Sequence, residues 1–129
     1  METTSIIIIS GVALLVGFMI YTHRAAKSME GTSAELLLEI MPEIADHDPA
    51  LVYCYTTACG PCKSMLPVIE EMQTDNRPVF KLDVRAHLSL SRRCGIRATP
   101  TTLVVKDGMI SKVVIGMKTR PALDALLES

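Results

Sequence analysis

The motif Cys59-Gly60-Pro61-Cys62 constrains this chain more than any other feature of its sequence. It follows an apolar run, residues 51–55, that predicts a buried β-strand, and it precedes apolar residues at helical spacing. A thiol at the start of a helix lies against free backbone N–H groups and the positive end of the helix dipole, which both favour the thiolate. The thiolate is the nucleophile of disulfide exchange. The motif therefore predicts that Cys59 attacks a disulfide and that Cys62, one turn deeper, resolves the intermediate by closing a Cys59–Cys62 disulfide. Taken alone, a C-x-x-C pair is equally typical of half a structural metal site.

The remainder of the chain predicts alternating helices and strands. Ser33 is a candidate N-cap for a helix that reaches Met41, and Asp107-Gly108 is typical of a tight hairpin turn. The predicted order from residue 33 is α-β-α-β-α-β-β-α. The later elements are a strand over 79–84, a short helix over 88–94, strands over 101–105 and 109–115, and a last helix that starts near Pro121.

The N-terminal segment has a different character. Residues 3–22 carry no charged side chain, and their number matches the ~20 apolar residues that a helix needs to cross a bilayer. Only Glu2 precedes this run, whereas Arg24 and Lys27 follow it, which is the reverse of a cleavable signal peptide. We therefore expect a transmembrane anchor over 1–22, in contact with the lipid bilayer, a polar juxtamembrane linker over 23–32 and a folded domain over 33–129. The charge bias favours a cytoplasmic domain, and an extracytoplasmic domain is the alternative.

Net charge excludes one class of partner. The chain has 13 basic and 14 acidic residues, for a formal net charge of −1, so the sequence offers no basic face for nucleic acid. The three histidines lie far from Cys59 and Cys62 in sequence. We therefore expect no metal and no cofactor.

Further motifs downstream extend the pattern into a resemblance to the thioredoxin family. Pro67 stands five residues after Cys62, as in the active-site helix of that family. The resemblance covers roughly residues 51–127. Its other parts are Lys63 after the second cysteine, a segment over 95–101 that ends in Thr99-Pro100-Thr101 and is similar to the family's cis-proline segment, the hairpin at 106–108, and Gly116 before the last helix.

The resemblance carries expectations about fold and activity. It implies a thioredoxin-like α/β fold, with a central mixed sheet flanked by helices, and a dithiol that reduces protein disulfides and is itself reduced by an upstream thiol donor. It implies that Thr99 and Pro100 lie against Cys59, and that the backbone of Thr99 pairs with a substrate chain next to Ala58. Gly60 and Pro61 are similar to the residues of reducing members of the family; disulfide oxidases and isomerases on the same fold are the alternatives.

Two positions depart from the family pattern. Ala58 stands where the family usually has Trp, and Tyr53 stands where it has a buried Asp that is thought to accept the proton of the resolving cysteine. A phenol with an ordinary pKa near 10 cannot act as a base at neutral pH. Lys81, which would face that Asp, is left as a possible accessory residue with a buried stem.

An alternative of another class uses all four cysteines. Cys54, Cys59, Cys62 and Cys94 nearly reproduce the spacing of plant-type ferredoxins that hold a [2Fe–2S] cluster. That hypothesis leaves the two proline motifs unexplained. Otherwise Cys54 is expected to be a small core residue, and Cys94 a candidate regulatory thiol.

Overall fold

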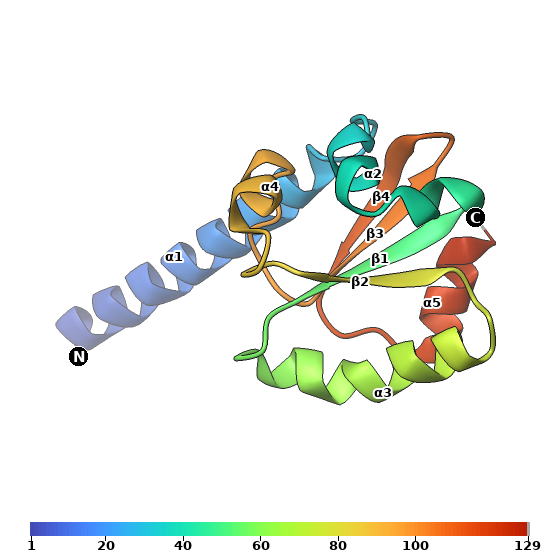
Figure 1. Ribbon diagram of the computed structural model, residues 1–129. Coiled ribbons are helices and arrows are strands. Elements are labelled where there is room, and N and C mark those ends of the chain that lie inside the picture. Colours follow the sequence, from blue (N-terminus) through green and yellow to red (C-terminus); the bar gives the residue numbers. More distant parts are fainter. Residues whose placement is uncertain (129) are drawn as a thin grey trace.

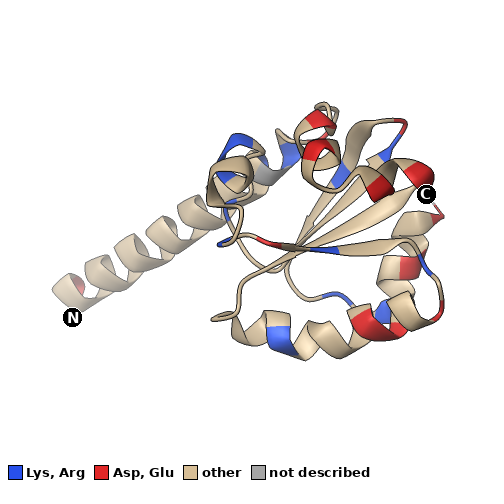
Figure 2. Ribbon diagram, viewed as in Figure 1, with Lys and Arg blue, Asp and Glu red and all other residues tan. Residues whose placement is uncertain are grey.

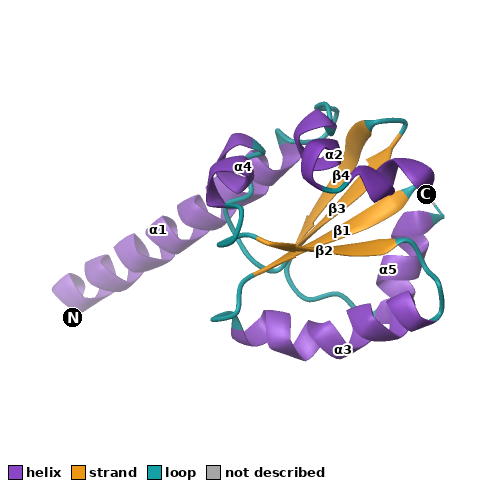
Figure 3. Ribbon diagram, viewed as in Figure 1, coloured by secondary structure: helices purple, strands orange, loops and turns teal. Residues whose placement is uncertain are grey.

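A mixed four-stranded sheet with helices on both faces forms the centre of the computed structural model, which describes residues 1–128 (Figures 1 and 3). The strand order is β2-β1-β3-β4, with β1 parallel to β2 and β3 antiparallel to both β1 and β4. This arrangement confirms the predicted thioredoxin-like mixed sheet. The strands are β1 (Ala50–Tyr55), β2 (Val79–Asp83), β3 (Thr101–Lys106) and β4 (Met109–Ile115).

The sheet separates two hydrophobic cores, because successive side chains of a strand point to opposite faces. Val52 and Cys54 of β1 face a core shared with Leu37 and Ile44. Leu51 and Tyr53 of β1 face the other core, which α3 (Gly60–Thr74) and α5 (Arg120–Leu127) cover. Every residue from Ala50 to Cys54 is fully buried, as expected for a strand with helices on both faces.

The remaining elements follow the predicted order, with one correction at a helix start. They are α2 (Glu35–Ile40), the 3₁₀-helix η1 (Pro42–Asp46) and α4 (Leu88–Arg93). The N-cap of α2 is Ala34 rather than Ser33, and its side chain forms no capping hydrogen bond. Ser33 instead forms a β-bridge with Met109, and its hydroxyl accepts a hydrogen bond from the Glu35 backbone at 3.2 Å.

Helix α1 (Glu2–Lys27) extends away from the domain (Figure 1). Its apolar segment is long enough to cross a membrane, a property shared by signal sequences and by core helices of soluble proteins. That segment is not buried by the rest of the chain, so it is not a core helix of this domain. The predicted linker over 23–32 is also corrected: residues 23–27 continue α1, and Met29 is only 5 % exposed in the core.

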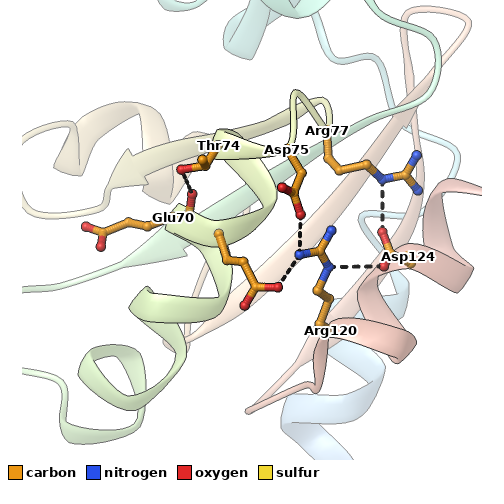
Figure 4. Close-up of polar contacts among 7 residues, drawn as sticks. Glu70, Thr74, Asp75, Arg77, Arg120 and Asp124 are labelled. Atoms are coloured by element: carbon orange, nitrogen blue, oxygen red, sulfur yellow. Dashed lines mark hydrogen bonds and ion pairs between the residues drawn. The ribbon is translucent and has the colours of Figure 1, made fainter.

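A network of ion pairs joins the C-terminal part of α3 to α5 (Figure 4). Arg120 forms ion pairs with Glu71 and with Asp75, the latter at 2.6 Å. Asp124 forms ion pairs with Arg120 at 3.4 Å and with Arg77 at 2.9 Å. Hydrogen bonds to Asp75 and Glu71 raise the pKa of Arg120 further above its ordinary value. This network holds the two helices together at the end of α3 that is remote from Cys59.

Candidate active site

Cys59 and Cys62 lie at the N-terminus of α3. Cys59 is the N-cap, and its sulfur accepts a hydrogen bond from the backbone N–H of Cys62 at 3.2 Å. The two residues form a disulfide, with their Cα atoms 5.2 Å apart. Cys59 is partly exposed, whereas Cys62 is 2 % exposed. In the reduced protein the same N–H group would stabilise a thiolate on Cys59, the sulfur that a substrate can reach.

The end of β1 positions this helix start. After Tyr55 the chain turns through residues 56–58, where the N–H of Cys59 donates to the carbonyl of Thr56 at 3.3 Å. Ala58 is exposed and presents only a methyl group beside Cys59. Gly60 and Pro61 are also exposed, and Pro61 occupies the first turn of the helix, where a missing N–H costs no hydrogen bond. The residues that flank Cys59 and Cys62 in sequence on this exposed surface, Ala58, Gly60 and Pro61, therefore have small side chains.

The predicted proline segment lies at the same end of the sheet. The Thr99–Pro100 peptide bond is cis, and Pro100 is buried, with its carbonyl accepting from Gly116 at 2.9 Å. The next residue, Thr101, is the first residue of β3 and pairs with Cys54 near the end of β1. Pro100, just before β3, and the loop just after β1 therefore lie at the same end of two neighbouring strands. Thr99 is partly exposed, and within residues 1–128 its backbone forms no hydrogen bond.

Tyr53 contacts the resolving cysteine directly. Its hydroxyl donates a hydrogen bond of 2.6 Å to the carbonyl oxygen of Cys62, and its ring stacks on Tyr55 with centroids 5.6 Å apart. Burial raises the pKa of Tyr53 to about 12, with smaller contributions from Tyr55 and Cys54. Tyr53 is therefore a neutral hydrogen-bond donor at physiological pH and not a base. The sequence showed that the family's carboxylate is missing, but it gave no signal for this hydrogen bond.

Lys81, the possible accessory residue, lies on β2 opposite Tyr53. It pairs in register with Tyr53, which puts both side chains on the face of the sheet that α3 covers. However, β2 is an edge strand and Lys81 is exposed. Its charge lies in solvent.

The other two cysteines belong to the opposite side of the sheet. Cys54 is fully buried in the core that contains Leu37, and Cys94 packs partly exposed against the same core, whereas Cys59 and Cys62 belong to the core under α3. Burial raises the pKa of both free thiols, with the neighbouring Arg93 partly offsetting the effect at Cys94. Four cysteines divided by a sheet cannot share one iron–sulfur cluster, so the ferredoxin hypothesis is wrong. Within residues 1–128 no group of three or more His, Cys, Asp or Glu side chains could hold a metal ion.

Known proteins with similar sequences include thioredoxins. The chain is 36 % identical to a thioredoxin of Mycobacterium tuberculosis over 83 residues, which cover 62 % of this chain and 72 % of that protein. A thioredoxin of Bacillus subtilis is 36 % identical over 72 residues, covering 54 % of this chain and 69 % of its own.

Structural similarity and the family's sequence profile agree with these matches. Oxidised mitochondrial thioredoxin 3 of Saccharomyces cerevisiae has a TM-score of 0.59 at 30 % identity, over 71 % of this chain and 88 % of that one. The thioredoxin profile matches residues 32–129, which begin just after α1 and include the disulfide and the cis-proline segment. On this evidence the chain belongs to the thioredoxin family.

Proposed function

We propose that Cys59 and Cys62 are the redox centre through which this thioredoxin-family protein reduces disulfides of other proteins, and that α1 anchors it to a membrane. Thiol–disulfide oxidoreduction follows from membership of the family. The observation that carries the residue assignment is the geometry of Cys59: a partly exposed sulfur at a helix N-cap, bonded to a buried partner one turn away.

The chemistry begins with the reduced dithiol. The Cys59 thiolate attacks one sulfur of a substrate disulfide, forms a mixed disulfide and releases the other substrate sulfur as a thiolate. Cys62 then loses its proton and attacks the Cys59 sulfur, which closes the Cys59–Cys62 disulfide and releases the second substrate thiol. Two electrons pass from the protein to the substrate. An upstream reductase returns them before the next turnover.

Substrate binding would use the segment before Pro100. The backbone of Thr99 is unpaired within the described residues and lies at the end of the sheet that carries Cys59. An extended substrate chain can pair with such a backbone by adding a short strand, while its side chains remain free to vary. The small residues Ala58 and Gly60 leave room for that chain over the sulfur.

Membrane attachment is supported by α1. Its apolar segment is exposed along its whole length, which is unfavourable in water and favourable in a bilayer. Arg24 and Lys27 lie in its last turn, next to the domain. Basic residues flanking a span stay on the cytoplasmic side, so we propose that the domain is cytoplasmic.

Trapping experiments test the assignment of the two cysteines. A Cys62→Ser protein should accumulate mixed disulfides with substrate proteins, because the attack by Cys59 still occurs and resolution does not. The Cys59→Ser protein is the matched control and should trap almost nothing. Equal trapping by the two variants, or trapping by Cys59→Ser alone, would contradict the proposed roles.

A further inference from the structure

Helix α1 is docked on the domain rather than joined to it by a loose tether. Thr22 and Ala25 in its last turns line a hollow together with residues 95–98 and with Ile115 of β4, so these segments lie against one another. The Tyr21 hydroxyl accepts a hydrogen bond from Arg97 at 3.5 Å. These contacts limit the angles that the helix can take relative to the domain.

The turn after α1 is fixed as well. The N–H of Gly31 donates to the carbonyl of Ile110 at 2.7 Å, and the N–H of Ile110 donates to Thr32 at 2.8 Å. The Glu30 side chain accepts a hydrogen bond from the backbone of Val113 at 3.2 Å. Met29 is inserted into the core and reaches Gly95 so closely that a side chain there would meet its Cγ at 3.3 Å. The joint is therefore part of the folded domain.

This docking places the anchor and the disulfide at the same end of the domain. The segment that contacts α1 leads directly into Thr99 and Pro100, and β4 ends beside Pro100 through the Gly116 hydrogen bond. Figure 1 shows that α1 and the loop before α3 extend from the sheet toward the same side. Exposed apolar residues also mark this end, namely Ile115, Met117 and Leu88.

Charge is distributed unevenly over the domain (Figure 2). Basic residues gather on α4 and on the last turn of α1, whereas acidic residues gather on α2, η1 and the far part of α3, where some basic residues also lie. We define the basic collar as Arg24, Lys27, Arg92, Arg93 and Arg97. These five basic residues lie near the point where α1 leaves the domain, and Asp83 at the end of β2 is an acidic residue at the same end of the sheet.

We infer that the basic collar rests on anionic lipid headgroups and that the disulfide site faces the bilayer, so that its substrates are disulfides held close to the membrane surface. The inference rests on the proposed function and specifies its substrate class. Anionic lipid attracts basic residues only within about a Debye length of the surface, and a docked joint would keep the basic collar near that surface. A free tether would let the site sample all heights above the bilayer.

Reduction of lipid-tethered disulfides tests this geometry. The full chain, reduced beforehand, is placed in vesicles of phosphatidylcholine with phosphatidylglycerol. It is given one disulfide peptide in three forms: free in solution, attached to lipid by a short spacer, and attached by a long spacer. Each tethered rate is divided by the rate with the free peptide, which corrects for protein orientation. We expect the short spacer to give the higher ratio. A long spacer that is equal or better would overturn the inference.

Two kinds of variant separate the effect of the docked junction between α1 and the domain from the effect of the basic collar. A flexible Gly-Ser insertion of about 12 residues between Lys27 and Ser28 should abolish the preference for the short spacer, and a preference that persists would contradict the role of docking. Arg92→Glu should lower the short-spacer ratio severalfold on anionic vesicles and leave it unchanged on phosphatidylcholine alone. Lys106→Glu makes the same charge change at the remote hairpin and should not change the short-spacer ratio. If Arg92→Glu and Lys106→Glu changed this ratio equally, the proposed role of the basic collar would be wrong.

The rate with the free peptide distinguishes failure of the proposed disulfide-reductase function from failure of the membrane-facing geometry. If wild type fails to reduce the free peptide, the proposed function fails. If it reduces the free peptide but shows no preference for the short spacer, only the membrane-facing geometry fails. The Arg92→Glu and Lys106→Glu proteins keep every residue of the redox site, so their rates with the free peptide report correct folding.

Discussion

The hydroxyl group of Tyr53 donates a 2.6 Å hydrogen bond to the carbonyl oxygen of Cys62, the residue assigned to resolve the mixed disulfide. The position is one at which thioredoxins usually have a buried Asp. A carboxylate there can take a proton, whereas a phenol with a pKa of about 12 can only donate one at neutral pH. This chain therefore holds the resolving cysteine by its backbone and provides no base for it at this position.

The first prediction concerns the second step of exchange. Tyr53→Asp should speed release from the mixed disulfide by about tenfold or more, because a positioned general base typically contributes ~10²–10⁴-fold. It should also cost roughly 3 kcal/mol of stability, since it removes a buried ring and buries an acid. Stopped-flow turnover of a disulfide substrate separates the two steps.

Tyr53→Phe is the matched control for that experiment. It removes only the hydroxyl group and should destabilise the protein by about 1 kcal/mol, the typical value of one hydrogen bond. Its second step should keep the pH profile of wild type between pH 6 and 9, because Tyr53 does not titrate there. A profile that changes in Tyr53→Phe would mean that the phenol takes part in proton transfer.

The second prediction concerns the reactivity of the four thiols. In reduced native protein at neutral pH, Cys59 should alkylate roughly tenfold faster than the others, because it is the partly exposed thiol at a helix N-terminus. Cys94 should follow, slowed by its raised pKa, and Cys54 should react only on unfolding. Mass-spectrometric mapping over time gives the order; labelling of Cys62 or Cys94 before Cys59 would contradict it.

The third prediction concerns stability at alkaline pH. Burial raises the pKa of Cys54 well above its ordinary value, so the unfolded chain loses this proton first as pH rises. Stability is thus fully present below about pH 8.5 and should fall above it by up to about 1.4 kcal/mol per pH unit for this group. Tyr53 should add a further loss above about pH 10. Denaturant unfolding across pH 7–11 measures both.

Cys54→Ala and Cys94→Ala distinguish the source of that loss. Cys54→Ala should be less stable at neutral pH but show a flatter decline between pH 8.5 and 10. Cys94→Ala should stay closer to wild type in slope, because Cys94 is only partly buried. Parallel slopes for wild type and Cys54→Ala would show that Cys54 is not responsible.

The fourth prediction concerns the side of the membrane. With Arg24 and Lys27 on the domain side of the apolar segment, the domain should be protected from protease in right-side-out vesicles and digested after detergent is added. Removing the two flanking positive charges tests whether they set the orientation: Arg24→Gln combined with Lys27→Gln should increase the fraction of protein digested without detergent. Digestion of wild type without detergent would place the domain on the outer side.

Local motifs in the sequence predicted much of this structure. The C-x-x-C helix start, the proline segment and the Asp-Gly hairpin each depend on a few adjacent residues, and all three are present as predicted. At Asp107 and Gly108 the backbone has φ values of 54° and 72°, as a tight hairpin turn requires. Motifs of this kind can be read without knowing what packs against them.

Features that depend on distant partners were not predicted. Ser33 is the better N-cap by preference, yet pairing with Met109 of β4 displaces the helix start to Ala34. Residues 28–32 are polar overall and predict a linker, but Met29 and the hydrogen bonds to β4 tie them to the domain. The hydrogen bond from Tyr53 joins a strand to a helix. Periodicity within one segment carries no information about such contacts.

The division of the cysteines between two faces of the sheet has a chemical consequence. A protein that makes and breaks disulfides risks reacting with its own spare thiols, and a bond from Cys59 to a third cysteine would stop turnover. Here Cys54 and Cys94 lie behind a layer of hydrogen-bonded backbone that the sulfur of Cys59 cannot cross without unfolding. The sheet therefore prevents Cys59 from forming a disulfide with Cys54 or Cys94 of the same chain, so the chain can retain these two thiols without inactivating itself.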